Sequence, residues 1–177
     1  AIEHHYICKM KSLVFFYLLF ACLNSSAQQP VSCACKGFVD SNYVGIIHLK
    51  DTRTGKSVQS IPYKHKKGNY LLFDITQAAD SFFFVKMRYA ISGNSYEGWI
   101  KKSKYLVTFL KQESLEIPLL YEASYTSKIK IKIPTKSSIN FQIFNCTQNW
   151  VYIKGLKRDS KLQGWIHSQN QCINPLA

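Results

Sequence analysis

The sequence predicts an all-β protein built from two small β-barrels in tandem, and three observations lead to this prediction. The tripeptide Gly-Trp-Ile occurs twice, as Gly98-Trp99-Ile100 and Gly164-Trp165-Ile166. Each copy closes a series of short aromatic and β-branched runs separated by turn residues, a pattern typical of a barrel or sandwich. The chain also has almost no apolar stripe with helical spacing.

The first barrel is expected over residues 43–111, where polar turns separate the runs of apolar residues. The turn at 51–56 carries a glycine that tolerates a positive φ, and a basic loop occupies 64–69. A further polar turn covers 92–95. The expected strands of this barrel are 44–49, 58–63, 70–75, 82–87 and 97–100.

The second barrel is expected over residues 112–177, where the same order of runs returns. Its expected strands are 117–121, 128–133, 139–144, 150–154 and 162–167. In 128–133, lysine and isoleucine alternate, which predicts a strand with one solvent-exposed face of lysines and one face of buried isoleucines. The junction 101–116 is not rich in Pro, Gly or Ser, and 105–110 is apolar enough to form a strand. We therefore expect the barrels to be held in a fixed arrangement.

Residues 1–27 are predicted to be a signal peptide. Lys9 and Lys11 precede the apolar run 13–23, and Ser25-Ser26-Ala27 provides small residues before a cleavage site. Residues 1–9 lack signal-like character and are interpreted as an over-extended start before Met10. The apolar run is too short to cross a bilayer as a helix. We expect export to the periplasm or the extracellular space; lipidation of Cys22, in a lipobox-like segment at 19–22, is the alternative.

Four cysteines lie after the expected cleavage site: Cys33, Cys35, Cys146 and Cys172. An even number in an exported chain favours disulfides, and three pairings are possible. A bond between Cys33 and Cys35 is disfavoured by their spacing. Either Cys146 pairs with Cys172 within the second barrel, or the N-terminal segment 28–42 is tied to the C-terminal domain. A zinc site is the alternative, but the usual paired spacing is missing, so no metal is expected.

Two segments carry a resemblance to a known family. Phe83-Phe84-Val85-Lys86 with Gly98-Trp99-Ile100, and 150–154 with Gly164-Trp165-Ile166, resemble the C-terminal half of bacterial SH3-like domains. The Arg-Ser/Gly-Pro signature that often opens such domains is missing from both copies. The resemblance implies that the glycine permits a close backbone approach, and that the tryptophan packs into the barrel with one edge near the surface. It further implies adhesion to cell-wall material or to another protein.

The candidate ligand-binding residues are the aromatic side chains of both barrels and the dense basic loop. Aromatic rings can stack on sugar rings or on proline-like peptide surfaces. The alternative is that most of these rings, above all the tryptophans, belong to the core. The candidates in the first barrel are Tyr63, Lys64, His65, Lys66, Lys67, Tyr70, Tyr96 and Trp99, and those in the second are Tyr121, Tyr125, Trp150, Tyr152 and Trp165.

The charge balance favours an anionic partner. The chain has 23 Lys and Arg against 10 Asp and Glu, with a formal net charge of +13. Export makes nucleic acid an unsuitable partner, and the lysines can instead solvate strand edges. The sequence predicts a module that binds peptidoglycan or an envelope protein or peptide. The alternative is an inhibitor or immunity-type protein that blocks a secreted enzyme with its cationic loop.

Catalysis is not expected. A cysteine nucleophile needs a free thiolate beside a histidine, whereas all four cysteines after the cleavage site can be oxidised. His167 and Cys172 form the best available pair, but their spacing is not specific to any enzyme. The few carboxylates are scattered through polar turns, and neither a phosphate loop nor a cofactor motif is present.

Overall fold

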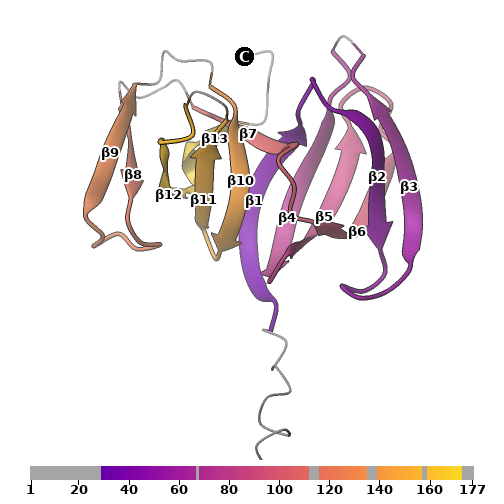
Figure 1. Ribbon diagram of the computed structural model, residues 1–177, viewed down its shortest axis with the longest axis horizontal. Helices are drawn as coiled ribbons and strands as arrows, with labels where there is room; N and C mark the ends of the chain where they lie inside the picture. Colours follow the sequence, from indigo (N-terminus) through magenta and orange to yellow (C-terminus); the bar gives the residue numbers. More distant parts are fainter. Residues whose placement is uncertain (1–28, 67, 112–115, 135–138, 157–158, 173–177) are drawn as a thin grey trace, which may run out of the picture.

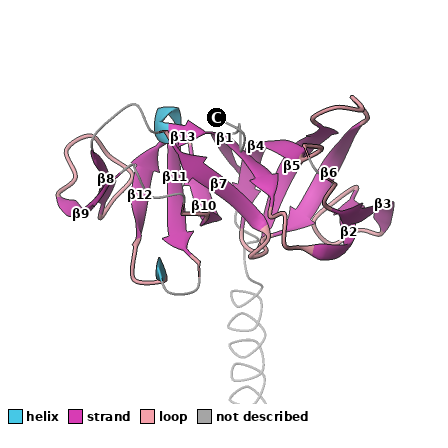
Figure 2. Ribbon diagram, turned by 90° about the horizontal axis from the view of Figure 1, so that it is seen from above, coloured by secondary structure: helices cyan, strands magenta, loops and turns pink. Residues whose placement is uncertain are grey.

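The structure is a computed structural model and describes residues 29–66, 68–111, 116–134, 139–156 and 159–172. Strands make up most of the described chain, as Figure 2 shows, and Ser168–Asn170 (η2) forms a short 3₁₀ turn. The predicted all-β class is confirmed. The expected signal peptide and Cys22 lie outside the described residues. No helix among the described residues has the length and apolar character that a membrane crossing requires.

The strands divide into two halves that lie side by side, with β1 and β7 between them (Figure 1). They form one antiparallel sheet in the order β3-β2-β6-β5-β4-β1-β7-β10-β11-β12-β8-β9, and β13 pairs with β7. The first half comprises β1 (Val31–Val39), β2 (Val44–Lys50), β3 (Ser57–Lys64), β4 (Leu71–Ala79), β5 (Phe82–Tyr89) and β6 (Ser95–Lys101). The second half comprises β7 (Leu106–Leu110), β8 (Glu116–Leu120), β9 (Ile129–Pro134), β10 (Phe141–Thr147), β11 (Trp150–Gly155), β12 (Gln163–His167) and β13 (Gln171–Cys172).

The strand order of the first half returns in the second half. Strands β3-β2-β6-β5-β4-β1 correspond one by one to β9-β8-β12-β11-β10-β7. Trp99 on β6 lies opposite Phe84 on β5, and Trp165 on β12 lies opposite Tyr152 on β11. The two Gly-Trp-Ile segments therefore occupy corresponding strands.

The glycines of the two tripeptides lie against corresponding backbone positions in their respective halves. A Cβ on Gly98 would lie 2.8 Å from the Lys50 carbonyl oxygen, and a Cβ on Gly164 would lie 2.9 Å from that of Leu120. Lys50 ends β2 and Leu120 ends β8, and a register irregularity occurs at both places. In each half, the glycine lets the tryptophan strand cross close to the backbone of the hairpin beside it.

Strand β7 joins the two halves. Val107 on β7 lies opposite Phe38 on β1 and also opposite Gln142 on β10, so β7 lies between the two halves. Leu110, at the end of β7, lies opposite Gln171 on β13. Leu106 and Val107 are fully buried, and Leu106 belongs to one core cluster that contains residues of both halves. The halves therefore share a strand and a continuous hydrophobic core.

Residues 28–42, expected to form an N-terminal segment before the first barrel, contain β1 in their described part. The strand lies between β4 and β7 in the middle of the sheet, and its side chains alternate between exposed and buried up to Gly37. Gly37 has no room for a side chain, because a Cβ there would meet the Val107 carbonyl oxygen, Phe73 and Ile143. The N-terminal segment is thus part of the core architecture.

The expectation that the isoleucines of 128–133 are buried is wrong for two of the three. Ile133 is buried, but Ile129 is 53% and Ile131 39% exposed. Strand β9 lies at the end of the sheet and pairs with β8 on one side. Alternating isoleucines are buried only where another part of the protein covers their face of the strand. This face of the outer hairpin β8-β9 extends beyond the core.

Candidate functional site

An aromatic surface covers the outer face of the second half. On β11, Trp150 and Tyr152 alternate with the buried residues Val151 and Ile153, so the two rings lie on the same face. On β12, Trp165 and His167 lie two residues apart in the same manner. The register places Trp150 opposite His167 and Tyr152 opposite Trp165. The aromatic surface, as we use the term below, consists of Tyr125, Phe144, Trp150, Tyr152, Trp165 and His167.

The rings of this surface contact one another in two groups. Tyr125, Trp150 and His167 form a triangle with ring centroids 5.0 to 5.5 Å apart. Tyr152 lies edge-on to Trp165 at 5.3 Å and to Phe144 at 6.1 Å. Edge-to-face contacts at these distances stabilise aromatic pairs and fix the ring orientations.

Much of this surface is open to a ligand. Tyr125 is 80% and Phe144 52% exposed, whereas Trp150 is buried beneath its neighbours and Trp165 is half-buried. The ring nitrogen Nδ1 of His167 accepts a hydrogen bond from the backbone N–H of Gln169 (3.3 Å). Its Nε2 is buried and forms no hydrogen bond with the described residues. Exposed rings over a fixed aromatic base provide a platform on which a sugar or proline ring can stack.

The loop between β8 and β9 positions Tyr125. The Ser127 hydroxyl accepts a hydrogen bond from the Glu122 backbone N–H (2.9 Å), and the Ser127 N–H donates to the Ser124 carbonyl (3.2 Å). Tyr121 is also exposed, but its ring contact is with Lys130, whose Nζ lies 5.7 Å from the ring centroid. The structure thus gathers Tyr125 with three other candidates from the second barrel and places Tyr121 against β9.

The corresponding face of the first half carries charges. Phe84 and Trp99 lie edge-on at 5.4 Å, as Tyr152 and Trp165 do in the second half. The guanidinium of Arg53 lies 5.9 Å from the Trp99 ring and 3.4 Å from the Asp80 carboxylate. Phe82 lies opposite Lys101, where the second half has Trp150 opposite His167. The repeated scaffold therefore presents different chemistry in its two halves.

Three tyrosines predicted as ligand residues of the first barrel pack against their own half. The hydroxyl of Tyr63 is buried and donates a hydrogen bond to the Val39 carbonyl (3.2 Å), and burial raises the pKa of Tyr63 to about 12. The ring centroid of Tyr70 lies 4.5 Å from that of His65, and the Tyr96 ring lies edge-on to the Tyr89 ring with centroids 6.3 Å apart. Trp99 is buried.

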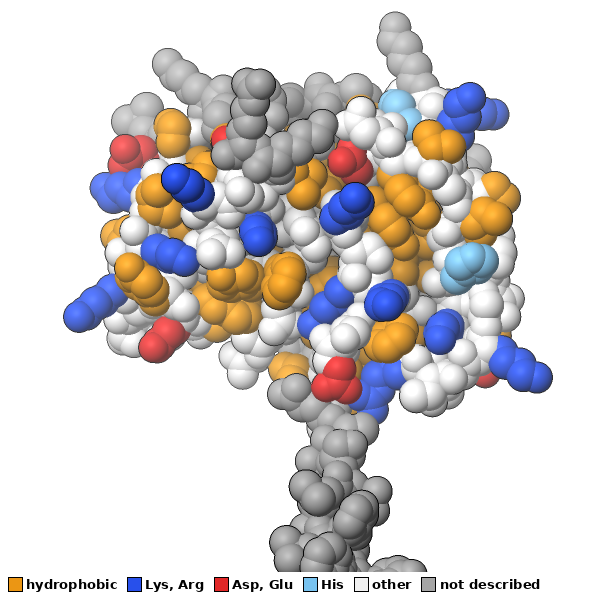
Figure 3. All heavy atoms as spheres, viewed as in Figure 1, with side chains coloured by type: hydrophobic (Ala, Val, Ile, Leu, Met, Phe, Trp, Pro, Cys, Tyr) orange, Lys and Arg blue, Asp and Glu red, His pale blue; other side chains and the backbone are white. Residues whose placement is uncertain are grey.

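The lysines of the basic loop lie on the surface. Lys64 and Lys66 are exposed, and Lys67 lies outside the described residues. On the face shown in Figure 3, Lys and Arg side chains are spread over both halves, between patches of hydrophobic side chains.

Phe144 and His167 were not recognised from the sequence as members of the site. Phe144 lies at a register irregularity between Ile143 and Asn145, so strict alternation along 139–144 does not place its ring. The sequence pattern pairs His167 with Cys172 as a candidate catalytic base. Its position two residues after Trp165, on a strand, is the signal that would have placed it beside the tryptophans.

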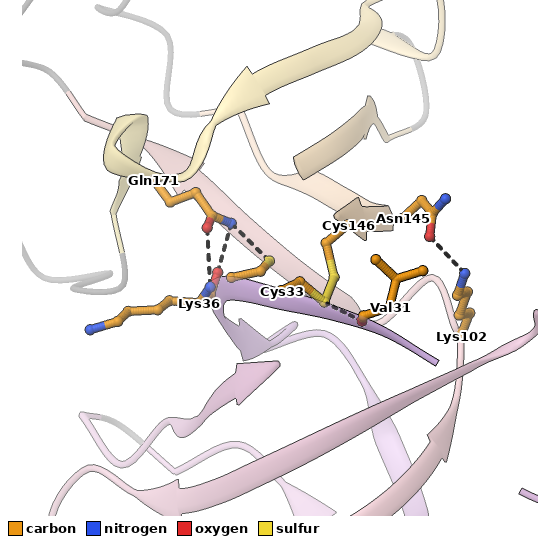
Figure 4. The surroundings of a disulfide bond; sticks show 8 residues. Val31, Cys33, Lys36, Lys102, Asn145, Cys146 and Gln171 are labelled. Carbon is orange, nitrogen blue, oxygen red and sulfur yellow. Dashed lines mark hydrogen bonds between the residues drawn. A yellow bond between two sulfur atoms is a disulfide. The ribbon is translucent and has the colours of Figure 1, made fainter. Parts of the chain in front are cut away.

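The disulfide links Cys33 on β1 to Cys146 on β10, with Cα atoms 5.8 Å apart (Figure 4). Of the alternatives left open by the sequence, the structure has the one that ties the N-terminal segment to the second half. The backbone of Gln148 adds to this link, since its N–H donates to the Ser32 carbonyl and its carbonyl accepts from the Ala34 N–H, both at 2.7 Å. Lys102, from the first half, donates a hydrogen bond to the Asn145 side chain (2.9 Å).

Gln171 binds the backbone of β1 with both ends of its amide. Its oxygen accepts from the Lys36 N–H (3.0 Å) and its nitrogen donates to the Lys36 carbonyl (2.8 Å), as a neighbouring strand would do. The same nitrogen lies 3.4 Å from Cys35 Sγ. Burial raises the pKa of the Cys35 thiol to about 12, although the Gln171 contact acts to lower it. Cys35 therefore stays a protonated, structural thiol at neutral pH.

No group of three or more His, Cys, Asp or Glu side chains in the described residues has metal-binding geometry.

No family model matches the sequence, and no curated protein sequence matches it either. Two solved structures, NlpC2 and NlpC1 from Trichomonas vaginalis, are similar at 17% and 18% identity with TM-scores of 0.35 and 0.34. The matches cover 81% and 84% of this chain, which spans about half (49%) of each of those proteins.

Proposed function

We propose that this protein is an exported module of the bacterial cell envelope that acts by binding rather than by catalysis. Its ligand is peptidoglycan, or an envelope protein or peptide, and both halves are SH3-like barrels. The observation that supports the proposal most directly is the aromatic surface of the second half. Four of its six residues, Tyr125, Trp150, Tyr152 and Trp165, come together from a loop and two strands, with Tyr125 in contact with Trp150 and Tyr152 in contact with Trp165.

The pairing of β7 supports two barrels in tandem. The first half returns to its first strand, because β1 pairs with β4 on one side and with β7 on the other. The second half does the same, because β7 pairs with β10 and with β13. Pairing between the first and last strands of a unit is a feature of small barrels, and a partly open barrel can keep edge strands such as β3 and β9. In this arrangement β7 is the closing strand of the first barrel and the opening strand of the second.

Two features support an exported, envelope-bound role. A disulfide is compatible with an oxidising compartment. The net charge of +13 favours association with the anionic polymers and carboxylates of a cell wall.

Sedimentation with purified peptidoglycan tests the proposal. We expect the protein to pellet with the polymer at low salt, and Tyr125→Ala and Phe144→Ala each to weaken binding about three- to tenfold, as expected for loss of one stacked ring. Both side chains are largely exposed, so neither substitution should disturb the fold. Ile91→Ala, at a 73% exposed site in the first half, is the matched control and should bind normally.

Equal binding by all three variants would contradict a role for the aromatic surface. If the protein does not pellet but recovers one secreted enzyme from an envelope extract in a one-to-one complex that inhibits it, the inhibitor alternative is favoured instead.

A further inference from the structure

A groove of about 490 Å³ lies at the end of the β2-β3 hairpin, in the first half and on different strands from the aromatic surface. Its walls come from the start of β2, the end of β3 and the adjoining basic loop, with Tyr89 of β5 at one side. Two hydrogen bonds preform it: Tyr89 donates to the Pro62 carbonyl (3.4 Å), and Tyr63 donates to the Val39 carbonyl (3.2 Å).

One wall of the groove is aliphatic and exposed. Val44 is 68% and Ile46 54% exposed, and the register places them opposite Lys64 and Pro62, on the same face of the hairpin. The next residues of β2 in the core, Ile47 and Leu49, are completely buried, so β2 has aliphatic side chains on both faces. Adjacent exposed aliphatic side chains on a strand of known register mark a contact surface for an apolar group.

Two lysines place positive charge beside the aliphatic wall of the groove. Lys64 and Lys66 line the groove, and none of the described residues that line it is acidic. No salt bridge between described residues involves either lysine. A ligand that carries carboxylates beside aliphatic side chains would complement both walls.

The groove also lies against an open strand edge. Strand β3 is the last strand of the sheet and pairs with β2 on one side. An extended peptide can follow such an edge and present alternate side chains to the surface beside it. Aliphatic walls suit peptide side chains, whereas the aromatic surface suits rings.

We infer that this groove is a second ligand site, which takes an extended peptide segment of a partner protein that carries aliphatic and acidic side chains on the same face, at every second residue. The inference goes beyond the function proposed above and does not rest on it, because the two sites share no residue. The protein would then hold two different partners, one on each half.

Fluorescence anisotropy tests the inference at low salt, with a labelled peptide in which leucine and glutamate take turns at every second position and serine occupies the positions between them. We expect binding that Ile46→Ser weakens about tenfold and Lys64→Glu/Lys66→Glu weakens at least as much. All three side chains are exposed, and unchanged thermal unfolding of the variants would show that the fold is intact. The same peptide with lysine in place of each glutamate should not bind.

Matched controls separate the groove from the overall charge. Val58→Ser removes an aliphatic side chain of similar exposure (58%) from the same hairpin, and Lys56→Glu/Lys104→Glu makes the same charge change at two other exposed lysines. Both should bind the peptide within twofold of the unchanged protein. Equal weakening by these controls, or equal binding of polyglutamate, would overturn the inference, since charge alone would then explain binding.

Binding to anionic vesicles of phosphatidylglycerol is the last measurement, and it distinguishes a membrane site from a peptide site. Vesicle binding that is lost in the groove variants, with no peptide binding, would identify a membrane site and overturn the inference. Tyr125→Ala should leave peptide binding unchanged. If the groove binds no peptide, the sedimentation assay with peptidoglycan still tests the proposed function. If the aromatic variants bind peptidoglycan normally, the peptide assay still tests the groove.

Discussion

Replacing both Cys33 and Cys146 by alanine should destabilise the protein by about 5 kcal/mol. The bond joins residues 113 positions apart, so in the unfolded chain it closes a loop that contains nearly all of the first half and the second half as far as β10. The loop-closure relation assigns a constraint of this length about 5 kcal/mol at 25 °C. Alanine is preferred to serine because both positions are buried, and a serine hydroxyl there would need a hydrogen-bond partner.

Urea-induced unfolding, followed by tryptophan fluorescence, measures this loss. Since β7 belongs to both halves, we expect a single transition for the oxidised protein and a lower midpoint for the Cys33→Ala/Cys146→Ala variant. A reductant should lower the stability of the unchanged protein and leave the double variant unaffected, which controls for effects of the alanines. A loss below about 1 kcal/mol, or free thiols at both positions in the native protein, would refute the reasoning.

Three further predictions concern the junction and the repeat. Because burial raises the pKa of Cys35 from 9.0 to about 12, the folded state keeps a proton that the unfolded chain releases. Stability should therefore fall above pH 9 by on the order of 1.4 kcal/mol per pH unit, and Cys35→Ala should lack this component in denaturation measured from pH 8 to 11. Gly164→Ala places a Cβ 2.9 Å from Leu119 and the Leu120 carbonyl oxygen, and should cost about 2 kcal/mol in thermal unfolding; a loss below about 0.5 kcal/mol would count against the close approach. Gln171→Ala leaves the N–H and carbonyl of Lys36 without their partner, so we expect a loss of about 2 kcal/mol and faster amide exchange at Lys36; unchanged exchange there would argue against the role of the amide.

The candidate site was predictable where alternation along a strand decides it. Trp150 and Tyr152 lie two residues apart on β11, and Trp165 lies on the neighbouring strand, so a period of two residues places all three on one face. Tyr125 is a candidate by residue type alone, because the loop geometry that folds it over Trp150 has no signal in the sequence. Phe144 was missed because it lies at a register irregularity.

The candidates of the first barrel show why residue type is not sufficient. Tyr63 alternates correctly with exposed neighbours on β3, but its ring points to the buried face and its hydroxyl reaches the Val39 carbonyl on β1. The sequence does not reveal which face of a hairpin is covered. That depends on which other strands pack against it.

Local patterns were sufficient for most strands of this protein, because strand alternation and turn residues are properties of neighbouring positions. They also indicated the repeat, through two copies of Gly-Trp-Ile. Tertiary structure alone decided that the segment around Cys33 is a central strand, that Cys33 pairs with Cys146, and that β7 serves both halves. Each of these depends on pairing between residues far apart in the chain, and such pairing is set by the order of strands in the sheet and not by any local signal.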